Sequence, residues 1–298
     1  MSRRGTVLFA AMCVIWGIPY LLIKVAVRDL SPAMVVLGRT SIGALVLLPI
    51  ALMRGDLAPL RAKWRPLLAY TFVELAVPWM LLSTAEKKLP SSLTGLLVAA
   101  VPLVGFTIAW ILGDRHLINT RSALGLVVGL VGVGALAGFD GAGADVGSVL
   151  IVGIVVVGYA TGPVILARAL HDVPSLGVVT ASLALCALAY IPLGLANAPD
   201  EMPSGRVIAS IVTLGLVCTA LAFVIFFELI KEIGPTRATI ITYVNPAVAL
   251  VLGVGFLHES LGIASLIGFV LVLVGSVLST TRSRREREQV QMAMVAEP

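Results

Sequence analysis

Charged residues are scarce in this chain, and that scarcity excludes most soluble folds. Only 12 % of the 298 residues are charged, whereas 59 % are hydrophobic and the mean hydropathy is +1.05. A soluble domain of this length needs more charge to cover its surface. The apolar runs are about 20 residues long, enough to cross a hydrocarbon core as helices. In lipid each backbone group must be bonded within its own segment. The sequence therefore predicts an all-α integral membrane protein.

Cysteine and histidine are also few, with three of each. The cysteines lie inside apolar runs, the histidines lie in predicted loops, and neither set has the spacing of metal ligands. We therefore expect no metal and no cofactor. Walker, aspartate-rich diphosphate and His–Glu metalloprotease motifs are absent from the sequence, so we expect that the chain is not an enzyme. We interpret the net charge of +5 as a topology signal and expect no nucleic-acid partner.

Ten apolar segments separate clusters of charged and turn residues. The predicted spans are 6–25, 33–53, 66–85, 92–112, 121–138, 147–167, 175–196, 206–228, 236–257 and 261–280. Four Lys and Arg residues fall on one side (Arg28, Lys87, Lys88 and Arg206), two lie within spans, and the other 15 fall on the side of the N-terminus. The positive-inside rule then predicts that both termini are cytoplasmic.

The chain repeats itself with an offset of 144 residues. This single shift aligns helix ends, loops and two mid-helix prolines: Pro19 with Pro163, Lys24 with Arg168, Ser31 with Ser175, Pro59 with Pro203, Lys87 with Lys231 and Pro102 with Pro246. Near the end of each half the offset becomes 143 and pairs Gly125 with Gly268 and Gly132 with Gly275. We expect these glycines to pack spans 5 and 10 closely against span 4 or 9.

Each copy of the repeat holds five spans, so the second copy enters the membrane from the opposite side. We predict two inverted five-helix repeats around a central cavity, with residues 1–140 as the first, 141–281 as the second and 282–298 as a basic, polar cytoplasmic tail. This arrangement is typical of secondary transporters, whose substrate site lies near the midplane between the halves.

Three stretches resemble the EamA family of the drug/metabolite transporter superfamily. They are Trp16–Pro19 followed by Arg39; Thr219–Ala238, with Phe226-Phe227-Glu228 and Gly234-Pro235; and Tyr243-Val244-Asn245-Pro246 through Glu259 to Gly275. The turn Gly113-Asp114-Arg115-His116 departs from the family's glycine–glutamate turn. The resemblance implies a cavity lined by spans 1, 3, 4, 6, 8 and 9, with spans 5 and 10 at the periphery. It also implies export of amino acids or small metabolites across a bacterial inner membrane.

Glu74 is the main candidate for function because it lies near the middle of the third span. A carboxylate at that depth costs several kcal/mol unless it is paired, hydrated or protonated. It is predicted to accept a proton, to anchor a substrate ammonium group, or to form a structural ion pair with Arg39. Arg39 is more simply a clamp. Lys24 is expected to snorkel to water, and Glu228 to be a solvated charge at the interface.

The remaining candidates are prolines that bend helices and side chains that line the cavity. Pro19, Pro102, Pro163 and Pro246 are predicted to make matched kinks, which serve alternating access or only shape the packing. Together with Glu74, the predicted substrate-binding residues are Trp16, Tyr20, Trp79, Met80, Tyr159, Tyr243 and Asn245. The alternative for such rings is an interfacial belt, to which we assign Tyr70 and Trp64 near the inner boundary.

We therefore predict a secondary transporter that exports amino acids or related metabolites by alternating access. The alternatives are an exporter of organic cations, in which Glu74 pairs with the cation, and an intramembrane enzyme. The expected partners are a small-molecule substrate and the lipid bilayer, and the expected assembly is a monomer or a weak homodimer.

Overall fold

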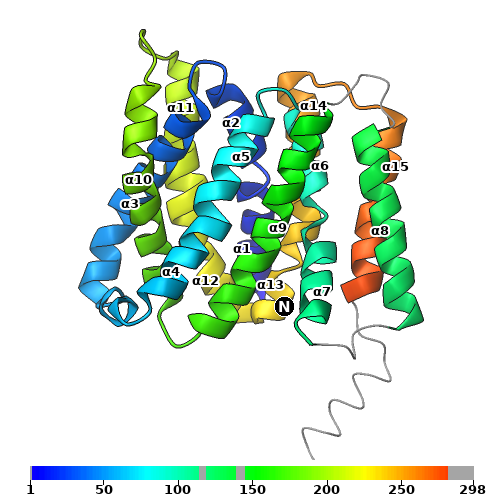
Figure 1. Ribbon diagram of the computed structural model, residues 1–298, viewed down its shortest axis with the longest axis horizontal. Helices are drawn as coiled ribbons and strands as arrows, with labels where there is room; N and C mark the ends of the chain where they lie inside the picture. The colour runs from blue at the N-terminus through cyan, green and yellow to red at the C-terminus, as the bar shows by residue number, and fades with distance from the viewer. Residues whose placement is uncertain (1, 114–118, 139–144, 281–298) are drawn as a thin grey trace, which may run out of the picture.

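The structure is a computed structural model that describes residues 2–113, 119–138 and 145–280. These residues form a bundle of helices and contain no strand (Figure 1). Within the described residues, nine helices, counted through their kinks, are long and apolar enough to cross a membrane, and a tenth, Ile241–Leu257, is apolar and shorter. The chain is therefore a multi-pass membrane protein with the ten spans that the sequence predicts. The basic tail after residue 281 and the turn at 114–116 lie outside the described residues.

The first five spans are built from eight labelled helices and two short segments. Span 1 is α1 (Arg3–Ile15) and α2 (Pro19–Ala26); span 2 is α3 (Pro32–Arg54), followed by η1 (Ala58–Arg61); span 3 is α4 (Trp64–Tyr70), the π-helical segment η2 (Thr71–Ala76) and α5 (Val77–Ala85); span 4 is α6 (Ser91–Val98) and α7 (Val101–Ile111); span 5 is α8 (Thr120–Gly138).

The second half repeats this order. Span 6 is α9 (Val146–Ala169); span 7 is α10 (Ser175–Ala196); span 8 is α11 (Gly205–Gly215), the π-helical segment η4 (Leu216–Leu221) and α12 (Ala222–Ile233); span 9 is α14 (Ile241–Leu257), preceded by the turn α13 (Pro235–Ala238); span 10 is α15 (Ile263–Thr280). Two predicted boundaries were wrong: span 8 runs to Ile233 instead of 228, and span 9 starts at Ile241 instead of 236. The chain leaves α12 only at Gly234, whose φ of 82° favours glycine.

The two halves are related by an approximate twofold axis, which is visible in the contacts between α8 and α15. Gly125 packs against the backbone of Gly275, and Gly132 packs against the backbone of Gly268. The repeat pairs Gly125 with Gly268 and Gly132 with Gly275, so each contact is the mate of the other. Such reciprocal contacts are what a twofold axis through the pair requires. The structure thus confirms two inverted repeats.

Spans 5 and 10 lie side by side at one edge of the bundle (Figure 1). Our expectation that glycines of these spans pack against span 4 or 9 is confirmed for Gly129, which packs on Leu103 of α7. It was wrong for Gly125, Gly132, Gly268 and Gly275, which bring α8 and α15 onto each other. A Cβ at any of these positions would meet backbone of the opposite helix, so only glycine allows this approach. The remaining eight spans form the larger body.

The four mid-helix prolines do not act alike. The chain breaks between α1 and α2 just before Pro19, and between α6 and α7 just before Pro102. Pro163 and Pro246, their mates in the repeat, lie inside uninterrupted helices α9 and α14. Breaks therefore occur only at the two prolines of the first half, and matched kinks at all four prolines stay a prediction. At Pro19 the nearby Gly17 packs directly on Val248, and this close approach fixes the break in the first half only.

Candidate functional site

Spans 3 and 8, which are mates in the repeat, each pass through a π-helical turn halfway along. A π turn widens the helix by one residue and frees a backbone carbonyl. In span 3 the carbonyl of Ala76 accepts a hydrogen bond of 2.9 Å from the Tyr190 hydroxyl of span 7. In span 8 the Thr219 hydroxyl donates to the Leu214 carbonyl, five residues earlier, at 2.8 Å. Each π turn faces the half of the molecule to which it does not belong.

Glu74 lies in the π turn of span 3, at the middle depth that the sequence predicts. Its carboxyl packs directly on Gly162 of α9, where a Cβ would overlap it. The Oε2 atom is buried and has no hydrogen-bond partner. Tyr70 and Tyr159 lie within electrostatic range of this carboxyl. Glu74 thus enters the contact between spans 3 and 6, which belong to different halves.

Arg39 of α3 is buried, with 7 % of its surface exposed, and it does not pair with Glu74. Its Nε donates to the Thr219 hydroxyl at 2.8 Å, and its Cζ lies 3.6 Å from the centre of the Trp79 ring. Among the described residues no carboxylate lies within 4.0 Å of its guanidinium. The predicted structural ion pair was therefore wrong. A clamp to helix ends or to Glu74 was expected as well, whereas Arg39 instead holds the π turn of span 8.

Aromatic side chains surround these two charges. Trp79 and Tyr20 are buried, Tyr159 is partly buried, and Trp79 interacts with the Tyr159 side chain. Tyr20, Tyr159, Cys186 and Cys218 all lie within electrostatic range of Arg39. Met80 is partly buried against the neighbouring apolar cluster. We define this set as the central site: Tyr20, Arg39, Glu74, Trp79, Met80, Tyr159, Cys186, Cys218 and Thr219.

Trp16 lies in a different place from Tyr20, because the chain breaks between α1 and α2. Its ring contacts Phe226 and Phe223 of α12, with centroids 4.7 and 5.9 Å apart. Phe227 extends this stack. Trp16 thus belongs to an aromatic cluster between spans 1 and 8. Sequence reasoning missed the cluster because it did not pair the two helices.

Asn245 and Tyr243 of span 9 have partners within the protein. We assign the Asn245 amide so that its nitrogen donates to the carbonyls of Ile241 and Cys13, each at 3.0 Å, since the opposite orientation would place its oxygen against both acceptors. The Cys13 carbonyl is free because Gly17 donates to Val14 instead. Asn245 therefore joins spans 9 and 1 at the break.

The Tyr243 hydroxyl is 2.9 Å from that of Thr280 in span 10. This contact joins span 9 to span 10, which together with span 5 forms the peripheral pair, and it gives the Tyr243 hydroxyl a hydrogen-bond partner.

Charged residues near the ends of the spans differ in how far they are paired. Glu228 accepts hydrogen bonds from Arg4 and Lys231, both at 2.9 Å, in an exposed position that agrees with the predicted interfacial charge. Lys24 does not snorkel to water, and that expectation was wrong. Its Nζ donates to the main-chain carbonyls of Glu86 and Leu89, at 2.6 and 2.8 Å, beside a buried carboxyl at Glu86 that sequence reasoning missed.

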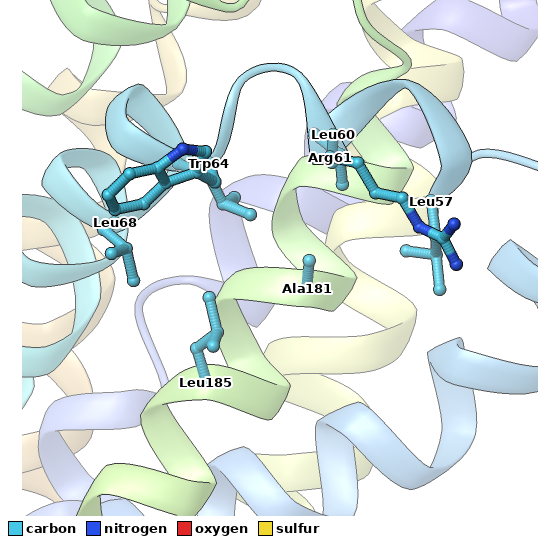
Figure 2. Close-up of a pocket in the computed structure, with 8 residues that line it drawn as sticks. Leu57, Leu60, Arg61, Trp64, Leu68, Ala181 and Leu185 are labelled. Atoms are coloured by element: carbon cyan, nitrogen blue, oxygen red, sulfur yellow. The ribbon is translucent and has the colours of Figure 1, made fainter.

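A pocket of about 310 Å³ lies away from the central site, where η1 and α4 meet α10 (Figure 2). It is lined by Leu57, Leu60, Arg61, Trp64, Leu67, Leu68, Ala181 and Leu185. Trp64 and Leu68 are exposed. This lining is apolar apart from Arg61, so the pocket offers no polar group for a substrate at its floor. The buried carboxyl and guanidinium of the central site lie between the halves instead.

Comparison with known proteins supports the same class. The chain is 25 % identical over 291 residues to the uncharacterized transporter YvbV of Bacillus subtilis, covering 96 % of this chain and 94 % of that one. It is 29 % identical over 278 residues to the uncharacterized inner membrane transporter YedA of Escherichia coli K12, covering 91 % and 88 %. A solved crystal structure matches with a TM-score of 0.67 at 21 % identity, covering 95 % of this chain and 98 % of that one. That match supports the fold alone.

The family comparison covers both halves of the chain. The profile of the EamA-like transporter family matches residues 3–137 and again residues 146–281. These two matches correspond to the two inverted repeats of the structure. The chain therefore belongs to the EamA-like transporter family and is a membrane transporter.

Proposed function

We propose that this transporter exports amino acids, or related small metabolites that carry both charges, across the bacterial inner membrane by alternating access. The observation that supports it is a carboxyl and a guanidinium that are both buried between the halves, neither with an ion-pair partner. Glu74 and Arg39 lie in spans 3 and 2 and face spans 6 and 8 of the other half.

The central site has the chemistry that a zwitterion requires. A buried charge without a counter-charge costs several kcal/mol. An amino acid compensates both charges at once, with its carboxylate on the Arg39 guanidinium and its ammonium group on the Glu74 carboxylate. The planar guanidinium is suited to two parallel hydrogen bonds to a carboxylate. Binding would thus relieve a cost that the empty site bears.

The surrounding rings supply the apolar part of such a site. Trp79, Tyr20 and Tyr159 offer flat surfaces with polar edges, and Met80 offers a deformable side chain. A lining of this kind can accommodate small amphiphilic substrates with different side chains. The residues of the central site therefore favour no single amino acid.

Alternating access is supported by the way in which the halves meet. The central site takes residues from spans 1, 2 and 3 of one half and 6, 7 and 8 of the other. Spans 1 and 4 are broken near their middle, and spans 3 and 8 carry π turns. Such interruptions allow the two halves of a helix to move separately. The charge bias of the loops supports cytoplasmic termini, and the name of YedA supports the inner membrane.

The test is uptake of labelled amino acids into proteoliposomes by the wild type, Glu74→Gln and Arg39→Lys. Glu74→Gln removes the charged contact to the ammonium group, a loss of about 2–5 kcal/mol that corresponds to roughly 30-fold or more in flux at limiting substrate. Arg39→Lys keeps the positive charge but removes the two parallel hydrogen bonds to the carboxylate, so flux should also fall, by a smaller factor. Glu228→Gln is the matched control, because that carboxylate is paired with Arg4 and Lys231 and lies outside the central site, and it should transport normally.

The outcomes separate the candidate substrates. Loss of flux in Glu74→Gln alone, with Arg39→Lys active, would indicate an organic cation instead of a zwitterion. Normal flux in both variants would contradict the proposal. Retained folding is checked by gel-filtration of the purified variants.

A further inference from the structure

A second group of charges lies at the predicted outer ends of spans 1, 3, 4 and 9, apart from the two charges that the proposed function uses. It contains Lys24 of α2, Glu86 directly after α5, Ser91 and Ser92 at the start of α6, and Glu259 after α14. We call these five residues the outer cluster. They join four spans from both halves.

Glu86 is the unusual member of the outer cluster. Its side chain has no exposed surface, and neither Oε1 nor Oε2 has a hydrogen-bond partner. An ionised carboxylate in such surroundings lacks both water and donors, which is costly. Burial accordingly raises the pKa of Glu86 well above its usual range, opposed by nearby Lys24 and reinforced by Glu259. The observed arrangement fits the neutral carboxyl.

Glu259, in the same cluster, is a carboxylate whose two oxygens both have hydrogen-bond donors. It accepts hydrogen bonds from the backbone N–H of Ser91 and Ser92, at 2.7 and 2.9 Å, and from their hydroxyls, at 3.0 and 2.6 Å. Four donors at the first turn of α6 stabilise its negative charge. Two carboxyls in one cluster therefore have opposite environments, one suited to the anion and one to the acid.

Lys24 holds the outer ends of the spans together. Its Nζ donates to the carbonyls of Glu86 and Leu89, which lie in the connection between α5 and α6. Span 1 is thereby tied to the connection between spans 3 and 4. Two of the three ammonium protons are used in this way, and neither bond reaches the Glu86 carboxyl.

We propose that Glu86 is a proton-binding site that closes the outer end of the transporter while it is protonated. When the proton leaves to water, the carboxylate requires a charged donor, and Lys24 is the nearest one. Lys24 keeps its own proton, and a pair with it alone would leave the Glu86 carboxylate buried and without water. The carboxylate is stabilised when water reaches it, which requires the outer ends of spans 1, 3 and 4 to separate, and the outer end opens.

The other titratable groups around Glu86 do not substitute for it. Those that face it are Lys24 and Tyr20 from α2, Glu259 from the segment after α14, and Tyr159 from α9, with Arg28 acting on Lys24. Lysine is charged and tyrosine neutral near pH 7, and Glu259 has its four donors. Glu86 is the member whose charge changes.

The direction of the pH effect follows from linkage. The closed arrangement binds the Glu86 proton more tightly than the open one, so low pH favours closure and rising pH favours opening, by up to about tenfold per pH unit. This inference builds on the proposed secondary transport, because an exporter must close its outer side after releasing substrate. An external proton arriving at Glu86 would provide that step.

Buried thiols of the central site provide the test without any substrate. Cys186 and Cys218 are free, 1 % and 0 % exposed, and lie beside Arg39. A membrane-impermeant maleimide is added outside right-side-out vesicles between pH 6 and 8. The Cys13→Ala background removes the third thiol. Labelling rates are divided by those of the denatured protein at each pH, which removes the pH dependence of the thiols themselves.

We expect the corrected labelling rate of the wild type to rise about tenfold or more between pH 6 and pH 8. Glu86→Gln should stay at the low rate throughout, and Glu86→Asp should regain a rise with pH. Asp29→Asn is the matched control, an exposed carboxylate on the same side whose Oδ2 accepts from Ser204 N, and it should behave as the wild type.

Two results would overturn the proposal. One is a pH response in Glu86→Gln equal to that of the wild type. The other is high labelling of Glu86→Gln at every pH. A failure of amino-acid uptake would instead contradict the proposed substrate and leave these labelling results intact.

Discussion

The third span of each half makes the same turn and presents different chemistry. Both spans pass through a π turn at mid-depth, η2 in span 3 and η4 in span 8. At the matching position the first half has Glu74 and the second has Cys218. Arg39 likewise has Leu183 as its mate, and Gly162, which receives the carboxyl, has Ile18. The backbone conformation is thus repeated in both halves, whereas the charged residues of the central site come from the first half alone.

This difference shows which features the inverted fold requires and which the substrate requires. Glycine contacts between α8 and α15 occur in reciprocal pairs because both halves need them to pack. A pair of opposite charges would gain nothing from duplication, since a second pair would add the cost of burying two more charges. The asymmetry of the central site therefore favours one small substrate held in one orientation.

The largest effect is expected from moving the carboxylate to the other half. In Glu74→Cys/Cys218→Glu the net charge is unchanged, but the new carboxylate lies beside Arg39 and pairs with it. Both charges are then unavailable to substrate, and flux should fall roughly 100-fold or more, since two charged contacts of about 2–5 kcal/mol are lost. Proteoliposome uptake measures it, with Glu228→Gln, which lies outside the central site, as a control of near-normal flux. Normal transport by the exchanged variant would show that the position of the charge does not matter.

A smaller effect, equal in both halves, is expected at the glycines of the peripheral pair. Gly132→Ala and Gly275→Ala each push a methyl group into the backbone of the opposite helix, which costs about 1–3 kcal/mol of stability. Thermal unfolding in detergent should show similar decreases for the two mates. Gly134→Ala has open space around it and should be neutral or stabilising.

Unequal decreases at the two mates would indicate that the halves are not equivalent in packing. Unchanged stability in both would contradict the tight contact between α8 and α15.

Much of the fold is readable from the sequence because lipid imposes simple rules. The ten spans follow from apolar runs, and the inversion follows from an odd number of spans per repeat. The partner of the glycine-rich spans was not predictable, since spacing indicates a close contact and does not identify the other helix. The π turns left no readable signal, because they depend on which side chain across the interface binds the freed carbonyl, as Tyr190 does.

The central site was predicted in part. Glu74 was identified because it lies near the middle of an apolar run, and the depth of a residue in the membrane follows directly from its place in such a run. The separation of Glu74 from Arg39 could not be predicted from the sequence. The one-residue widening of span 3 determines where the Glu74 side chain points, and the Trp79 ring determines where the Arg39 side chain points. Glu86 was missed for a related reason: it follows the end of span 3, where a charge normally meets water. Only the structure shows α2 and the segment after α14 covering it.

The smallest effect concerns how the two π turns are supported. Tyr190→Phe removes the donor to the Ala76 carbonyl and should cost about 0.5–1.5 kcal/mol of stability. Tyr190 binds backbone outside the central site, so substrate affinity should change little, whereas Arg39, which supports the other turn from inside the site, should affect affinity far more. Thermal unfolding and the substrate dependence of uptake are measured together, with Thr161→Val as a control that removes a hydroxyl bonded within its own helix. A loss of affinity in Tyr190→Phe as large as in Arg39→Lys would mean that the π turn of span 3, and not the charge that it carries, determines binding.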